Sequence, residues 1–272
     1  MRTFKYIFVC GTSFTAGGGF EDGNINTRTI LKKYMNEPIP EKMEDCAWPA
    51  YLKKLIDKDV KIYNLAMPGA GIEYLIRTTN EWIDKNPDKV KDTLFLLENS
   101  GYGRIELWDV ELDRYIVCNW DYAIRKEKFC ASAHSGKYWE DSHETAQKII
   151  SKQPLIETWL DTFGEPMKMV EDLNNRFFNF LCKLKYKEIE FKVFGEPLND
   201  PALHKEDIFL KNRLTLNVGD NEINHIHDFL IINNLQIKQL TNGESDDFHA
   251  TLEGNRVLAQ VYYNQIKKHY DL

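Results

Sequence analysis

The sequence predicts an α/β protein: a three-layer α/β/α sandwich around a mostly parallel, flavodoxin-like sheet. Short apolar runs at residues 5–11, 61–66 and 93–97 are each broken by nearby glycine, proline or polar residues, and they suit strands buried on both faces. Segments with the apolar spacing of helices follow them. This alternation is typical of βαβ units, and therefore of a parallel sheet with helices on both faces.

Helices are expected where apolar residues recur every three or four positions. Along residues 72–83 the positions that fall near one side of a helix are Ile72, Leu75, Ile76, Trp82 and Ile83. Pro49 is acceptable in the first turn of a helix at 48–56. The remaining expected elements are helices at 167–184 and 252–266 and strands at 188–194 and, more weakly, 235–240.

Two stretches lack this rhythm. Residues 103–165 show no clean period and hold four of the six tryptophans, namely Trp108, Trp120, Trp139 and Trp159. We expect an aromatic-rich insertion there, lying over the sheet edge or over the functional site. Residues 197–227 are polar and are expected to form loops. Because no linker divides the chain, we expect one domain over residues 1–272 with the insertion inside it.

The composition argues against several classes of protein. With 43% hydrophobic and 28% charged residues, the chain has the balance of a soluble globular protein. A net charge of −7 gives no electrostatic support for a nucleic-acid partner. The apolar run from Tyr6 to Cys10 is too short for a secretion signal, and no segment approaches the roughly 18 apolar residues of a membrane span. The five cysteines include no CxxC pair, which favours reduced thiols in a cytoplasmic protein and no zinc site built on cysteine.

A serine near one end of the chain and a histidine near the other are candidates for catalysis. Ser13 lies in GTSFT, directly after the first predicted strand, where a turn can present its hydroxyl and backbone N–H. Serine is a weak nucleophile until a base removes its proton. Asp246 and His249 are three residues apart on one loop, so the carboxylate can fix the imidazole tautomer. Taken alone, Ser13 could equally cap a helix, and the acidic residues could decorate a helix N-terminus.

Two further strand ends offer donors for a developing oxyanion. Gly69, in NLAMPGAG, can present an unobstructed backbone N–H after the second strand. Asn99, in ENSG, can donate a side-chain N–H after the third strand. Either segment alone is compatible with an ordinary turn. In chain order the four features are a nucleophile, a glycine, an asparagine and an Asp–His pair.

That order resembles the SGNH hydrolases, also called GDSL esterases, whose four sequence blocks supply Ser, Gly, Asn and His. The matching segments are GTSFTAG for Ser13, NLAMPGAG for Gly69 and the family's Asp-x-x-His for Asp246 and His249. TLEGN, after His249, resembles the family's helix entry. The resemblance spans residues 5–101 and 246–268 and leaves the insertion uncovered.

The chain departs from the family pattern in two blocks. Thr12 stands where the family usually has Asp before the nucleophile, but that Asp is not the triad acid. The third block usually reads Gly-x-Asn-Asp, and strict alignment puts Ser100 at the Asn position. A shift of one residue makes Asn99 the donor, which we favour because an amide is the better donor to an anion. Asp247 competes with Asp246 as triad acid, and Asp246 has the family spacing.

The resemblance implies a serine hydrolase that cleaves a carboxylic ester through a Ser13–His249–Asp246 triad and an acyl-enzyme. The oxyanion hole would consist of Ser13, Gly69 and Asn99, and no metal or organic cofactor is required. A short-chain ester or an O-acetylated carbohydrate is the expected substrate. Two alternatives stay open: acyl transfer to a sugar by the same triad, and a non-catalytic binding protein on a decayed SGNH scaffold. The oligomeric state is not readable from the sequence.

Overall fold

The computed structural model describes residues 2–18, 42–56, 59–99, 104–119, 131–132, 148, 151–163, 166–195, 207–223, 225–237 and 249–272. Its centre is a parallel sheet of four strands, in the order β3 (Lys61–Asn64), β2 (Tyr6–Cys10), β4 (Thr93–Asn99) and β8 (Phe191–Gly195). Of the strands in this sheet, β2 is the first in sequence, and it lies between β3 and β4, as in flavodoxin-like sheets. The predicted parallel sheet is confirmed.

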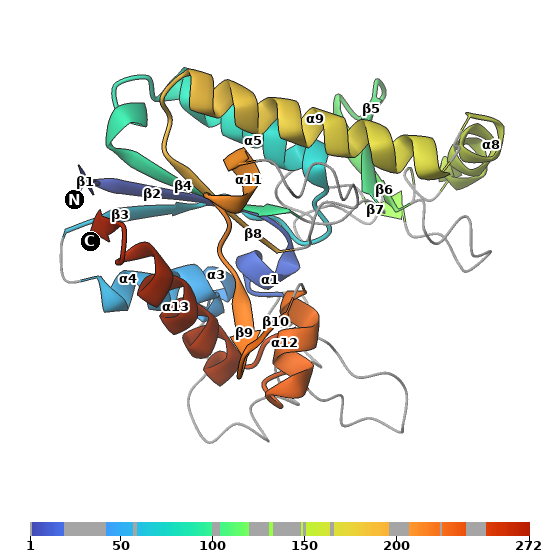
Figure 1. Ribbon diagram of the computed structural model, residues 1–272. Helices are drawn as coiled ribbons and strands as arrows, with labels where there is room; N and C mark the ends of the chain where they lie inside the picture. Colours follow the sequence, from blue (N-terminus) through green and yellow to red (C-terminus); the bar gives the residue numbers. More distant parts are fainter. Residues whose placement is uncertain are drawn as a thin grey trace.

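Two helical layers cover the sheet (Figure 1). On one face lie α5 (Ile72–Lys85) and α9 (Pro166–Tyr186), and on the other lie α4 (Trp48–Leu55) and α13 (Leu252–Ile266). This is the predicted three-layer α/β/α arrangement. The strand period of two divides the central residues between the layers. In β4, Leu94 and Leu96 pack toward α4 and α13, whereas Phe95 and Leu97 pack toward α5 and α9.

Most predicted elements lie within a few residues of their expected bounds. The helix expected at 252–266 has those bounds, and the third strand continues two residues further, to Asn99. The strand expected at 188–194 begins only at Phe191, because Glu188 has a left-handed backbone with φ 56° that ends the preceding turn. The weak strand at 235–240 is wrong in its described part, where Gln236 forms a single antiparallel bridge with Ala250 outside the central sheet.

Within the predicted insertion, three strands form an antiparallel sheet. These are β5 (Arg104–Asp109), β6 (Arg114–Asn119) and β7 (Ala131–Ser132), and helix α8 (Gln153–Phe163) follows them. The β5–β6 hairpin is fixed to α5, because Arg77 donates two hydrogen bonds, of 3.1 and 2.8 Å, to Glu106. The backbone N–H of Glu106 donates in turn to the carboxylate of Glu73 at 2.6 Å.

The expectation of loops over residues 197–227 is wrong in the described part, from 207 onward. The structure has α11 (Asp207–Leu210), β9 (Leu216–Val218), β10 (Asn221–Ile223) and α12 (Ile226–Ile232) there. These elements are three to seven residues long and bury at most three apolar side chains each, as α12 does with Ile226, Phe229 and Leu230, which is too few for a visible period. The other short elements are β1 (Arg2–Thr3), α3 (Met43–Cys46), η1 (Val90–Asp92) and β11 (Tyr270–Asp271).

Among the described residues, no helix has both the length and the apolar character that crossing a bilayer requires. In the part of the chain that the structure describes, Cys10, Cys46 and Cys182 are not joined in disulfides, and the first two are buried.

Candidate active site

Ser13 is the first residue of the single-turn helix α1 (Ser13–Ala16), three residues after Cys10, the last residue of β2. Thr12 precedes the helix in an extended conformation. Gly17 ends it with φ 90°, a left-handed conformation that favours glycine, and the carbonyl of Ser13 accepts hydrogen bonds from the turn that follows. The sequence therefore produces a tight strand–turn–helix connection with the serine at its apex.

His249 is held by backbone hydrogen bonds just before α13. Its carbonyl accepts from the N–H of Ile237 at 2.7 Å. Two residues later, Thr251 caps α13: its hydroxyl accepts from the N–H of Gly254 at 3.0 Å and donates to the carbonyl of Leu235 at 2.9 Å. These contacts fix the chain on both sides of the imidazole.

Ser13 and His249 meet at Gly18. A Cβ atom on Gly18 would lie 2.6 Å from Nε2 of His249 and 2.8 Å from Cβ of Ser13. The two side chains therefore flank one point, and these two atoms cannot be farther apart than the sum of those distances. The ring of Phe14 contacts the imidazole from another direction, with the ring centroids 5.2 Å apart. The residues predicted as nucleophile and base are thus brought together from opposite ends of the chain.

Beneath the serine turn lies a buried carboxylate that the sequence analysis did not single out. Glu98, 3% exposed, accepts hydrogen bonds from the N–H of Thr12 at 2.8 Å, the hydroxyl of Thr12 at 2.6 Å and the hydroxyl of Thr15 at 2.5 Å. Burial raises the pKa of Glu98 above its ordinary value, against the opposing effect of the hydrogen bonds from Thr12 and Thr15. The sequence feature that could have pointed to Glu98 is its place directly after the apolar run at 93–97, where an acidic residue continues a buried strand.

The loop that contains Gly69 adjoins the serine turn. The N–H of Met67 donates to the carbonyl of Gly11 at 2.9 Å, and the amide of Asn64 donates to the carbonyl of Thr15 at 3.0 Å. Gly69 itself has φ 77°, so its left-handed backbone explains the glycine.

Asn99 is the last residue of β4, where it pairs with Gly195. It is 1% exposed, and its position in the strand puts it on the face opposite to Glu98. Ser100, Asp246 and Asp247 lie outside the described residues.

The β5–β6 hairpin reaches this end of the sheet. The guanidinium of Arg104 donates to the carbonyl of Ala70 at 3.2 Å, one residue from Gly69. A Cβ on Gly71 would lie 2.9 Å from the backbone oxygen of Arg104. Part of the insertion therefore contacts the loop that the sequence predicts to hold an oxyanion donor.

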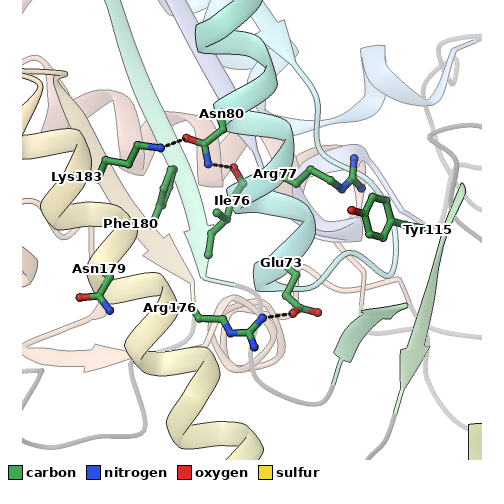
Figure 2. Close-up of a pocket in the computed structure, with 9 residues that line it drawn as sticks. All are labelled: Glu73, Ile76, Arg77, Asn80, Tyr115, Arg176, Asn179, Phe180 and Lys183. Carbon is green, nitrogen blue, oxygen red and sulfur yellow. Dashed lines mark hydrogen bonds and ion pairs between the residues drawn. The ribbon is translucent and has the colours of Figure 1, made fainter. Parts of the chain in front are cut away.

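Two cavities lie elsewhere on the molecule. One, of about 540 Å³, lies between α5, α9 and β6 (Figure 2). Two of its basic side chains interact with other residues of the lining: Arg176 lies 2.8 Å from Glu73, and Lys183 donates to the amide oxygen of Asn80 at 2.9 Å. The other, of about 1200 Å³, follows β3 and α4. Ser13 and His249 line neither cavity.

The described residues hold no cluster of three His, Cys, Asp or Glu side chains that could bind a metal ion.

Comparison with known proteins gives similarity at the level of structure. No protein-family model and no curated protein matches the sequence. Among solved structures, the chain is similar to the psychrotrophic esterase EstA from Pseudoalteromonas sp., with 11% identity and a TM-score of 0.44 over 97% of each chain. It is also similar to Axe2, an acetylxylan esterase from Geobacillus stearothermophilus, with 9% identity and a TM-score of 0.47 over 100% of this chain and 97% of that one. Identities of this size leave the activity to be judged on the chain's own residues.

Proposed function

We propose that the protein is a serine esterase in which Ser13 attacks the carbonyl of a carboxylic ester and His249 is the general base. The observation that carries this proposal is the meeting of the two side chains at Gly18. A nucleophile and a base within reach of one another, each on a fixed backbone, are what acyl transfer requires. Ser13 also starts a helix at a strand end, where open α/β sheets bind their ligands.

In the proposed reaction, His249 takes the Ser13 hydroxyl proton as the serine oxygen bonds to the carbonyl carbon. The tetrahedral oxyanion accepts hydrogen bonds from the N–H groups of Ser13 and Gly69 and from the amide of Asn99. Its collapse expels the alcohol, which receives the proton from His249, and leaves an acyl-enzyme. Water then attacks the acyl-enzyme in the same way, with His249 again as the base, and the carboxylic acid is released. Asp246 remains ionised and orients His249.

The substrate class in this proposal is a short-chain ester or an O-acetylated carbohydrate, and water is the only co-substrate. Acyl transfer to a sugar would use the same residues with a sugar hydroxyl in place of water.

A phosphonate ester probe tests the nucleophile directly. We expect mass spectrometry to find the adduct on Ser13 in the wild-type protein and no adduct in Ser13→Ala. Turnover of p-nitrophenyl acetate should disappear in Ser13→Ala and His249→Ala alike. A folded wild-type protein that is neither labelled nor faster than Ser13→Ala would favour the non-catalytic binding alternative.

A screen of esters of graded chain length and acetylated sugars, with and without a sugar acceptor, identifies the substrate and separates hydrolysis from transfer.

A further inference from the structure

Glu98 occupies a position that the strand pattern assigns to an apolar residue. In β4 the side chains of Leu94 and Leu96 enter the core against α4 and α13, and Glu98 is next on the same side. Trp48 from α4 and Tyr262 from α13 are fully buried on this side. A carboxylate here loses its hydration and must recover it from protein donors. Packing alone would favour leucine, so the acidic residue calls for another reason.

Within the described part of the chain, the hydrogen bonds to Glu98 come from two threonines, one on each side of Ser13. Oε1 accepts from the hydroxyl of Thr12, whereas Oε2 accepts from the N–H of Thr12 and the hydroxyl of Thr15. The approach is close enough that a Cβ on Gly11 would overlap the carboxylate. The end of β2 and the start of α1 are therefore shaped around this one side chain.

The direction of the hydrogen bond between Thr15 and Glu98 is fixed by a tryptophan. The indole N–H of Trp48 can only donate, and it lies 3.2 Å from the hydroxyl oxygen of Thr15. Thr15 thus accepts from Trp48 and uses its own hydrogen on Glu98. The result is a directed chain from Trp48 through Thr15 to Glu98, joined by the two bonds from Thr12. Networks in which every member is satisfied hold a single geometry.

This geometry bears on the nucleophile through Thr12. Glu98 holds Thr12 at both its backbone N–H and its hydroxyl, which fixes the orientation of the residue immediately before Ser13. The following peptide carries the N–H of Ser13, the same group that the proposed mechanism directs at the oxyanion. Thr15 fixes the other side of the serine within the same helical turn. Glu98 therefore constrains the chain on both sides of Ser13, through Thr12 and Thr15.

We propose that Glu98 is a positioning residue, whose carboxylate holds Thr12 and Thr15 so that the hydroxyl and the backbone N–H of Ser13 face the substrate. This inference rests on the proposed esterase function. It adds a residue that needs no contact with substrate. It also gives a reason for the threonine at position 12, because a hydroxyl there reaches the buried carboxylate.

The test is a set of variants assayed for kcat, KM, phosphonate labelling rate and thermal unfolding. Glu98→Leu removes every acceptor, and Glu98→Gln retains one carbonyl oxygen, so kcat should fall in the order wild type, Gln, Leu, by about 10- to 100-fold for Leu. Since the serine groups act mainly on the transition state, KM should change little. If Glu98→Leu does not fold, Thr15→Val removes one of the three hydrogen bonds to Glu98, together with the acceptor of the Trp48 indole N–H, and Thr15→Ser should regain the rate that Thr15→Val loses.

Glu106→Gln is the matched control, because Glu106 is also a buried carboxylate, 3% exposed, but is paired with Arg77. It should lower the unfolding temperature while leaving kcat unchanged. A Glu98→Leu protein with the kcat of wild type, or one whose kcat falls only as far as that of Glu106→Gln at equal loss of stability, would overturn the inference. A wild-type protein without Ser13-dependent turnover or labelling would instead overturn the proposed function, so the two failures are distinguishable.

Discussion

The imidazole of His249 packs against Gly18 at the point where any side chain would separate it from Ser13. Gly18 does not have a left-handed backbone, unlike its neighbour Gly17. Conformation therefore does not require glycine at position 18, and the requirement comes from the space between the nucleophile and the base.

Gly18→Ala should therefore impair activity more than stability. The new methyl group would lie within 3 Å of both side chains and force one of them aside. Because displacing catalytic groups by about 1 Å can cost about 100-fold, we expect a loss of that order in kcat/KM. The unfolding temperature should change by only a few degrees. An alanine variant with the full rate would show that Ser13 and His249 do not act together.

Gly69→Ala should impair both stability and rate. A left-handed backbone costs a residue with a Cβ about 1–2 kcal/mol, and relief of that strain would turn the N–H away from the oxyanion. The loss in kcat could reach the roughly 100-fold that a missing oxyanion donor costs.

Gly219→Ala is the control for this effect, because Gly219 has φ 60° and an added Cβ meets nothing within 4 Å. It should lose similar stability without loss of rate. If both variants retain full kcat, Gly69 is not part of the oxyanion hole.

Much of the fold could be predicted because its strands are fully buried. β2 is apolar throughout and β4 contains four consecutive apolar residues, Leu94 to Leu97, so the runs at 5–11 and 93–97 are visible without a period. The elements between 207 and 232 could not be predicted, since each is only three to seven residues long and buries at most three apolar side chains. Local pattern is informative only where an element is long enough to repeat.

The candidate site divides in the same way. Ser13 and Gly69 could be named from the glycine-containing loops after strands, and His249 from its spacing to Asp246. Glu98 could not, because its role depends on contacts with Thr12 and Thr15, more than eighty residues earlier in the chain. Gly18 likewise becomes informative only once the fold brings His249 against it.

Alanine substitutions at Asn99 and Ser100 can show which of the two side chains donates to the oxyanion. If Asn99 donates to the oxyanion, Asn99→Ala should lower kcat by roughly 100-fold, whereas Ser100→Ala should stay close to wild type. Asn99 is buried, so the unfolding temperature must be measured beside the rate. The reverse order of the two rates would assign the donor to Ser100.

Thr251 links the stability of α13 to the position of His249. Thr251→Ala removes the cap on Gly254 and the bond to Leu235, which should cost about 1 kcal/mol of unfolding free energy. A smaller loss of kcat/KM should accompany it, because the histidine is two residues away. Thr251→Ser preserves the hydroxyl and should regain both properties. An alanine variant as stable as wild type in urea unfolding would contradict the capping role.

Titration of Glu98 should also contribute to the pH dependence of the unfolding free energy. Burial raises its pKa in the folded protein above the value in the unfolded chain, so the folded state binds more protons between the two values. Its contribution is therefore fully present below the unfolded pKa and is lost as the pH rises through the folded pKa, with a slope of up to about 1.4 kcal/mol per pH unit. Glu98→Gln cannot titrate, so its unfolding free energy should lack that decline. Urea unfolding of both proteins across the acidic range measures the difference, and parallel curves would mean that the carboxyl titrates as it does in the unfolded chain.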